Sequence, residues 1–338
     1  MKSVSTWIQI GSVSTRVPSR SQRIAAGRVV REASVTGSFS QPCGARPGAR
    51  GTDSYARRVT DLKPILVLAA FEGWNDAGNA ASDAVALVAT AWDARTVATL
   101  DPEDYYDFQV NRPMVTRGDA GAELAWPSTR VSVATSPVTG RRVLLVQGIE
   151  PSMRWRQYTD ALLDVVAQWS GDADGVATVV GVGALLADVP HTRPIPVQST
   201  SDDPAVQESL GLDASEYAGP VGIISVLTHL AAQRGMQSLS VWAAVPHYVA
   251  QPPSPKATLA IVSALEEVLS EPLPVADLVD EARAWQRGVD ELAEEDPEIS
   301  EYVQQLEEAK DTAELPEATG EAIAREFERY LRRRDPGR

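Results

Sequence analysis

The 338-residue sequence has one cysteine, three histidines and no long apolar run. The lone Cys43 argues against a disulfide framework or a cysteine metal cluster, and three histidines leave little for a polyhistidine site. No run reaches the roughly 18 apolar residues that a membrane span needs. Basic residues are outnumbered by acidic ones, 31 to 46, which argues against binding to nucleic acid or to anionic membranes. With 43% hydrophobic residues, the composition predicts a soluble, cytoplasmic protein with a sizeable core.

Charge is unevenly distributed along the chain. Residues 1–60 hold 10 basic and 2 acidic residues, are rich in Ser, Arg, Gly and Pro, and show no sustained strand or helix period. Such a segment cannot bury enough apolar surface to offset the entropy lost on ordering, so we predict that it is a disordered basic segment. Its composition also fits an organelle transit peptide, or sequence read from a start codon upstream of the true one.

Strand and helix patterns alternate through residues 61–270. Runs rich in Ile, Leu and Val predict buried strands, and apolar residues at helical spacing predict the helices between them. The predicted strands are 64–71, 95–100, 130–135, 141–148, 175–187 and 237–249, and the predicted helices are 77–92, 155–169, 219–235 and 255–270. The turn-rich link "SPVTG" predicts a hairpin, and the Pro-interrupted run 193–201 predicts an edge or loop strand. We therefore expect a layered α/β domain with a largely parallel or mixed sheet.

From residue 271 the sequence becomes strongly acidic. Residues 271–338 contain 20 acidic and 9 basic residues, and we expect an acidic helical extension over 271–335. Three segments have narrow apolar stripes at helical spacing, namely Val279, Ala282 and Val289, then Tyr302 and Leu306, then Ile323, Phe327, Tyr330 and Leu331. Each helix should pack through that one stripe, on the α/β body, on another helix or on a second subunit, and leave its other face in water.

Loops at the predicted strand ends carry the candidate site residues, because α/β proteins place their sites there. The first loop, "FEGWNDAG", offers Asn75 or Asp76 as a helix cap and a helix N-terminus that could face an anion. Trp74 in the same loop is either part of a ligand-binding surface or ordinary core packing.

Two further loops contain histidine. "DVPHTRP" places Asp188, His191 and Arg193 in a segment stiffened by two prolines, where they could hold an anion or position a proton. The alternative is a structural loop in which Arg193 pairs with a local carboxylate. "WAAVPHYV" brings His247 to a strand end as well, and two histidines with a carboxylate would make a metal triad. Isolated histidines are more often structural, so we predict no metal site.

The fourth loop, "YAGPVGI", opens the predicted helix 219–235. Gly219 and Gly222 leave its first N–H groups accessible as a phosphate or carboxylate nest, unless it is an ordinary helix started by proline. The glycines at 181–183 lack the third glycine of a dinucleotide fingerprint, and the sequence has no Walker loop and no nucleophile elbow. We therefore predict no cofactor and assign no catalytic residue.

Five motifs in one order, "FEGWNDAG", "EPSMRW", "GALLADVPHTRPIPV", "YAGPVGI" and "SVWAAVPHYV", resemble the proteasome assembly chaperone 2 family in its actinobacterial form, from about Leu66 to Ser270. The resemblance implies a three-layer α/β fold with a mixed sheet, similar to the purine nucleoside phosphorylase-like class, and homo-oligomers. It also implies a chaperone or scaffold role near 20S proteasome assembly in the eukaryotic relatives. Family chaperones often end in a hydrophobic-Tyr-X tail, whereas here Tyr330 lies eight residues before the last residue. The family supplies no catalytic residues to carry over.

Two functions follow from these observations. We expect a non-catalytic oligomeric binding or scaffold protein, with proteasome subunits as partners by resemblance alone. The alternative is a phosphorylase- or hydrolase-like enzyme acting on an anionic substrate such as a nucleoside or phosphate ester. In that enzyme Arg193 would clamp the anion, and His191 or His247 would transfer a proton. Asp76 would orient a histidine or the substrate, so all four side chains would have to share one site.

Overall fold

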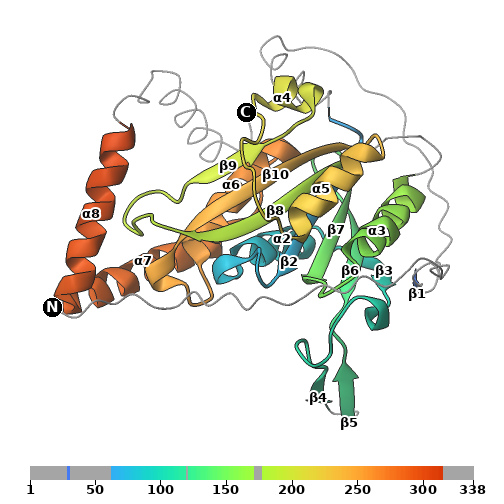
Figure 1. Cartoon of the computed structure of the whole chain (residues 1–338), viewed down its shortest axis with the longest axis horizontal. Coiled ribbons are helices and arrows are strands. Elements are labelled where there is room, and N and C mark those ends of the chain that lie inside the picture. The colour runs from blue at the N-terminus through green and yellow to red at the C-terminus, as the bar shows by residue number, and fades with distance from the viewer. Residues whose placement is uncertain (1–28, 31–61, 119–120, 171–176, 315–338) are drawn as a thin grey trace, which may run out of the picture.

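The computed structural model describes residues 29–30, 62–118, 121–170 and 177–314 (Figure 1). At its centre the described strands form a sheet in the order β1-β3-β6-β7-β2-β8-β10-β9. In chain order these strands are β1 (Val29–Val30), β2 (Ile65–Glu72), β3 (Arg95–Leu100), β6 (Thr129–Thr135), β7 (Arg142–Ile149), β8 (Ala177–Ala187), β9 (Val197–Thr200) and β10 (Gln237–Pro246). Apart from β1, the segment 1–60, for which we predicted disorder, lies outside the described residues.

Four neighbouring parallel strands, β7, β2, β8 and β10, make the middle of the sheet. Their sequences are nearly continuous apolar runs because helices cover both of their faces. In β2 only Glu72 is exposed, and in β8 the first eight residues are buried. Strand β6 runs antiparallel to β7, and β9 lies antiparallel at the edge beside β10, so the predicted hairpin and the predicted edge strand are both confirmed.

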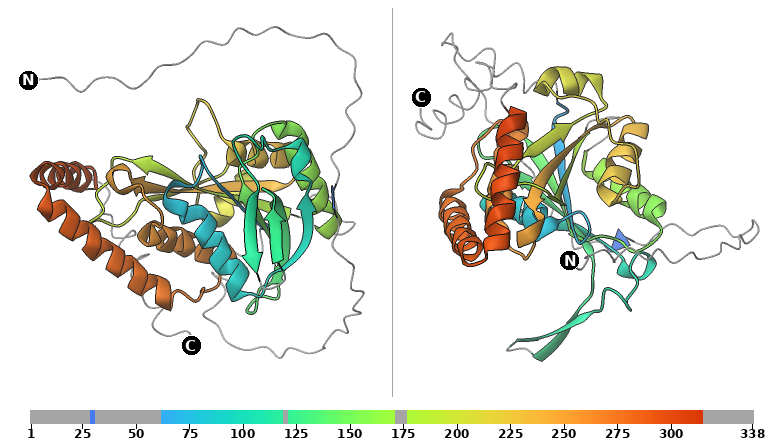
Figure 2. Two further views of the ribbon diagram at one scale, coloured as in Figure 1. Left: turned by 90° about the horizontal axis from the view of Figure 1, so that it is seen from below. Right: turned by 60° about the vertical axis from the view of Figure 1, so that its left-hand side comes forward.

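Helices cover the two faces of the sheet in separate layers (Figures 1 and 2). Helices α2 (Ala80–Ala91) and α6 (Pro255–Leu269) bury their apolar stripes on one face, and α3 (Trp155–Ser170) and α5 (Ile223–Gln233) bury theirs on the other. A short helix, α4 (Pro204–Leu210), follows β9. The expected α/β class with a mixed sheet is confirmed, and the purine nucleoside phosphorylase-like label stays a prediction.

Two long helices follow the α/β body, α7 (Ala276–Glu295) and α8 (Pro297–Glu314). In α7 the residues Ala282 and Val289 are buried as expected, but Leu278 takes the buried place that we assigned to Val279. In α8, Val303 is buried between the half-buried Tyr302 and Leu306. The third expected helix, with the stripe Ile323, Phe327, Tyr330 and Leu331, lies outside the described residues. None of the helices in the described ranges is long and apolar enough to cross a membrane.

Two local features differ from the predictions. Helix α5 begins at Ile223, not at residue 219, because the backbone at Gly222 is still extended. The hairpin of β4 (Met114–Gly118) and β5 (Gly121–Ala125) was not predicted. It extends away from the body (Figure 1 and the right view of Figure 2), and the residues of both strands are exposed, so no burial pattern marks them in the sequence.

The glycines of β8 have a packing role. A Cβ atom on Gly181 would lie 2.7 Å from Cγ2 of Ile224 in α5, and one on Gly183 would lie 2.4 Å from the ring of Trp242 in β10. Both distances are far below van der Waals contact. These glycines therefore let α5 and Trp242 approach the strand closely, which explains the glycine pair without a nucleotide.

We predict that Gly181→Val destabilises the protein by about 1–3 kcal/mol, because the added atoms overpack the contact between β8 and α5. The free energy of unfolding in urea measures this. Gly288→Ala in α7 is the matched control, since nothing lies within 4 Å of its Cβ position, and it should leave stability unchanged or slightly higher. Equal unfolding midpoints for Gly181→Val and the wild type would contradict the packing role.

Candidate functional site

The carboxyl ends of the parallel strands meet at one edge of the sheet, which we call the rim. Three contacts join the segments that form it. Asp76 pairs with Ala184 of β8 in an isolated bridge, and Gly222 lies against Asn75. The segments after β8 and β10 meet where His191 and Tyr248 form a hydrogen bond. The nine residues that the sequence singled out lie in the segments that follow β2, β8 and β10 or precede α5, namely Trp74, Asn75, Asp76, Asp188, His191, Arg193, Gly219, Gly222 and His247.

Asp76 is the residue that caps α2. Its buried carboxylate accepts hydrogen bonds from the backbone N–H groups of Ala81 at 2.7 Å and Ser82 at 3.2 Å, and from the Ser82 hydroxyl. Burial raises the pKa of Asp76, and its hydrogen bonds with Ser82 and Ala81 oppose that rise. The first N–H groups of α2 thus face a carboxylate of the chain itself. Asp76 occupies the place where the sequence suggested that an anion could bind.

Glu150 fills the same role at α5. Its Oε1 accepts a hydrogen bond from the backbone N–H of Ile223 at 3.1 Å and another from Nδ2 of Asn75 at 2.8 Å. Gly222 is required here, because a Cβ atom at this position would lie 2.1 Å from Oδ1 of Asn75. Gly219 lies in the exposed segment before the helix, where a Cβ would lie 2.6 Å from the Tyr217 hydroxyl. The predicted nest is therefore a helix start that Glu150 already occupies.

Arg193 binds the helical extension. Its Nε and Nη2 donate to the two carboxylate oxygens of Asp311 at 2.9 and 2.7 Å, and Nη1 donates to Glu307 at 3.0 Å. The hydroxyl of Thr192 donates to Glu307 as well. A bidentate arginine–carboxylate pair is among the stronger polar contacts in proteins. The "DVPHTRP" loop thus holds α8, and the carboxylates that pair with Arg193 lie more than a hundred residues away in the sequence.

His191 is buried under α7. Its Nδ1 lies 2.7 Å from the Tyr248 hydroxyl and its Nε2 lies 3.0 Å from Oδ1 of Asp290. Lys256 donates to the His191 backbone carbonyl and, at 2.7 Å, to Gln286. Burial lowers the pKa of His191 despite its hydrogen bond to Asp290. The imidazole therefore joins α7 to the body as a neutral, fully bonded group.

His247 lies beside His191 but forms its own pair. Its Nδ1 is 3.1 Å from Asp188, which also accepts a hydrogen bond from Tyr302 of α8. The rings of Tyr248 and Tyr302 stack edge-on with His247, at centroid distances of 5.8 and 5.6 Å. Within the described ranges no group of three His, Cys, Asp or Glu side chains is placed to hold a metal ion. Sequence reasoning missed the partners of the two histidines and Arg193, namely Tyr248, Asp290, Tyr302, Glu307 and Asp311.

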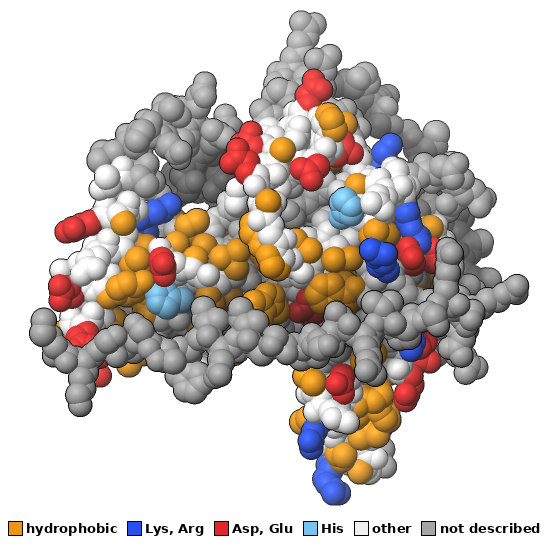
Figure 3. Space-filling model, in the orientation of Figure 1, with side chains coloured by type: hydrophobic (Ala, Val, Ile, Leu, Met, Phe, Trp, Pro, Cys, Tyr) orange, Lys and Arg blue, Asp and Glu red, His pale blue; other side chains and the backbone are white. Residues whose placement is uncertain are grey.

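Beside these polar contacts the rim segments also expose apolar side chains. Trp74 is 87% exposed, so the interpretation of Trp74 as core packing is wrong. The end of β8 and the segment before α5 carry four more exposed apolar side chains, Leu185, Leu186, Tyr217 and Val221. We call these five residues the rim patch. Figure 3 shows hydrophobic side chains gathered over the ends of β8 and β10.

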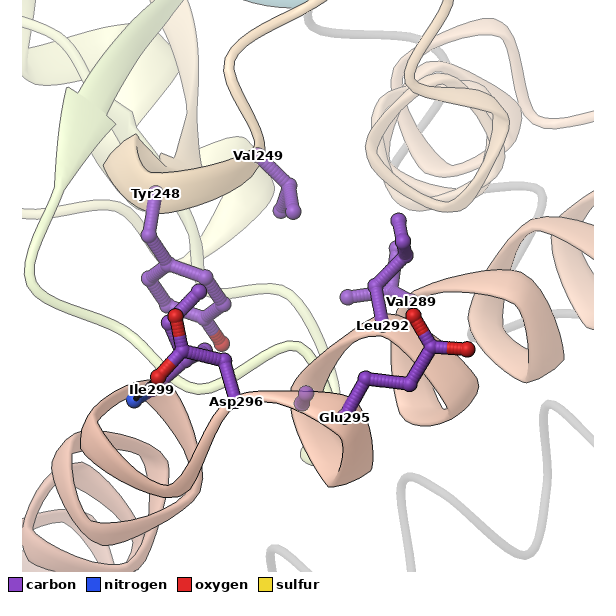
Figure 4. A pocket seen from close by; sticks show the side chains of 8 residues that line it. Tyr248, Val249, Val289, Leu292, Glu295, Asp296 and Ile299 are labelled. Carbon is purple, nitrogen blue, oxygen red and sulfur yellow. Dashed lines mark hydrogen bonds between the residues drawn. The ribbon is translucent and has the colours of Figure 1, made fainter.

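An apolar groove continues the rim onto the helical extension (Figure 4). It has a volume of about 420 Å³. Tyr248 and Val249 form one wall, and Leu292 of α7 and Ile299 of α8 face them. Exposed apolar surface thus lies on both the body and the extension.

Comparison with known proteins identifies relatives of this chain. A family model described as "PAC2 family" matches residues 70–293. A PAC2 family protein of Streptomyces avermitilis is 48% identical over 71% of this chain and 99% of its own, with a TM-score of 0.65. A proteasome-assembly chaperone homologue of Mycobacterium tuberculosis is 46% identical over 71% of this chain and 99% of its own, with a TM-score of 0.63.

A more distant structure shares the fold alone. The archaeal proteasome activator PbaB of Pyrococcus furiosus is 15% identical, covers 68% of this chain and 93% of its own, and has a TM-score of 0.55. No curated protein matches the chain. The family model matches most of the chain and agrees with the two bacterial structures, so this chain belongs to the PAC2 family.

Proposed function

We propose that this protein is a non-catalytic scaffold that binds partner proteins through the rim patch and assists proteasome assembly. The observation that carries the proposal is the exposed apolar surface around Trp74, on an edge whose polar groups are bonded to one another. Monomeric soluble proteins rarely expose large contiguous apolar patches, and such a patch commonly contacts another protein. The relative from M. tuberculosis, named as a proteasome-assembly chaperone homologue, supports the choice of partner.

The state of the polar residues argues against the enzyme alternative. That alternative needs Asp76, His191, Arg193 and His247 to converge on one substrate. Instead Asp76 caps α2, and Arg193 is bonded to two carboxylates of α8. Each histidine is bonded to a different carboxylate, His191 to Asp290 and His247 to Asp188. An anionic substrate would first have to displace α8 from Arg193.

We predict that Trp74→Ala weakens partner binding at least tenfold, because exposed tryptophans are frequent centres of interface energy. Purified 20S proteasome subunits of M. tuberculosis are the probe, and isothermal titration calorimetry gives the dissociation constant. The unfolding free energy should stay within about 0.5 kcal/mol of wild type, since the side chain packs on little. Val138→Ala is the control, because Val138 is similarly exposed in the turn between β6 and β7. Equal binding by wild type and Trp74→Ala, or no binding by wild type, would reject the proposal.

We predict that Arg193→Ala loosens α8 without unfolding the body. Loss of the pairs with Glu307 and Asp311 should speed amide exchange in 297–314 about fivefold, since these pairs oppose local opening of the helix. Hydrogen-exchange mass spectrometry measures it. Arg283→Ala is the matched control, because Arg283 forms an exposed pair with Asp280 within α7. Unchanged protection of α8 in Arg193→Ala would show that this contact does not hold the helix.

We predict that acid weakens the attachment of α7 through His191. Because its folded pKa lies below the ordinary value of 6.5, the unfolded chain takes up the proton first, and stability present above about pH 6.5 is lost as the pH falls. The difference in unfolding free energy between wild type and His191→Asn should therefore shrink between about pH 7.5 and about pH 5.5. Burial raises the pKa values of Asp76 and Glu271, so these groups change the unfolding free energy in the opposite direction. Both groups are present in wild type and variant, and their contributions cancel in the difference. A difference that grows on acidification would contradict the prediction.

A further inference from the structure

The groove lined by Tyr248, Val249, Leu292 and Ile299, which we call the extension groove, has apolar walls. Leu292 of α7 is 60% exposed there, and Tyr248 and Val249 stand across from it (Figure 4). Covering this leucine with another apolar side chain would stabilise the fold, because it would remove apolar area from water. Within the described ranges no segment covers it.

Acidic side chains surround the extension groove. Glu295 and Asp296 line it and are exposed, and none of the described residues in its lining is basic. Residues 276–314, which hold α7 and α8, contain 14 acidic and 3 basic residues. An occupant of the groove therefore needs apolar side chains next to positive charge.

The C-terminal segment of the chain has this composition. Residues 315–338 lie outside the described residues, so only their sequence is considered. They carry the predicted helical stripe of Ile323, Phe327, Tyr330 and Leu331. Residues 329–338 contain five basic residues and one acidic residue. The stripe is thus followed directly by positive charge, whereas the described helices of the extension are strongly acidic.

The connection from α8 is long enough to bring the stripe to the groove. Ile299 lies 15 residues before the end of α8 at Glu314, which is about 22 Å along the helix axis. Residues 315–320, "LPEATG", contain a proline and a glycine, which interrupt helices, and six residues is an ordinary length for a connection between two helices. A helix that runs back along α8 from residue 321 covers about 15 Å by Leu331, and the connection can span up to about 20 Å, which makes up the difference.

We propose that residues 321–334 bind, as the helix that their spacing predicts, in the extension groove of their own chain. The apolar stripe covers Leu292 and Ile299, and the arginines at 332–334 lie beside Glu295. Because the segment is tethered by a short connection, its effective concentration at the groove is about millimolar, which favours it over a second copy or another protein. A partner protein reaches the groove only after displacing it.

This contact uses no residue of the rim patch, so it lies beyond the proposed scaffold function. A failed test of the contact leaves the proposed binding at Trp74 standing, and the reverse also holds.

The first test places charge on the stripe of the full chain. Phe327→Glu with Leu331→Glu should speed amide exchange in residues 289–299 at least about threefold, because the end of α7 and the start of α8 lose their cover. Hydrogen-exchange mass spectrometry measures this region separately from the rest of the chain. Ala318→Glu with Ala322→Glu is the matched control, because it adds the same charge away from the stripe.

Unchanged exchange in β2 and β8 shows that each variant keeps its folded body. Equal exchange of 289–299 in the stripe variant and the wild type would overturn the proposal. An equally large effect of the control would overturn it too, because the effect would then come from charge alone.

The second test identifies the surface that the stripe contacts and the copy to which that surface belongs. A photoreactive benzoylphenylalanine replaces Phe327 in the full chain, and equal amounts of isotope-labelled and unlabelled protein are mixed before illumination. Mass spectrometry should find crosslinks to peptides containing 247–249 or 289–299, each within a single chain. The same probe at Ala322, on the opposite side of the predicted helix, should give far fewer of them. Crosslinks only to other elements, none at all, or crosslinks that mainly join labelled to unlabelled chains would overturn the proposal.

Discussion

Carboxylates of the chain itself occupy the positions where the rim could hold an anion, and the arrangement of the rim depends on this. The first N–H groups of a helix have no partner within it and must be bonded from outside. Asp76 bonds them in α2 and Glu150 bonds one in α5. Asp311 and Glu307 neutralise Arg193 in the same way. In a chain with 46 acidic residues, internal carboxylates are available for each of these contacts.

The polar groups of the rim are therefore bonded within the chain, and its exposed apolar side chains are a separate feature. Asp76, Arg193 and the two histidines are bonded to other parts of the chain, and exposed apolar side chains such as Trp74 lie on the same loops or on nearby segments. The rim patch and the hairpin β4–β5 both expose apolar side chains, and they belong to different elements.

The central strands were predictable because both faces of a parallel sheet are buried, so the sequence of β2 or β8 is a plain apolar run. The order of the rim motifs in the sequence was also enough to predict the family. The hairpin β4–β5 was not predicted because the residues of both its strands are exposed, and such strands have no burial pattern. The start of α5 was misplaced because it depends on Glu150, which follows β7 more than seventy residues earlier.

The attachment of the helical extension was the least accessible part of the site. His191 and Arg193 were singled out, and one alternative was a pair between Arg193 and a nearby carboxylate. The structure supplies the carboxylates from α7 and α8 instead, at sequence separations of about a hundred residues. The spacing of residues within a short motif gives no information about contacts with residues that far away in the sequence. The apolar stripes in the acidic sequence predicted α7 and α8. Only the tertiary fold determines which of their carboxylates contact the rim.

Glu150 bonds both to the loop that bears Trp74 and to the start of α5, while Asn75 packs on Gly222. That loop leads into α2 on one side of the sheet, and α5 lies on the other side. The two helix layers are thus joined at the rim by the Glu150 carboxylate and by the contact of Asn75 with Gly222. Loss of the Glu150 carboxylate would therefore remove the acceptor of the Asn75 amide and of the Ile223 N–H at the same time, one from each side of the sheet.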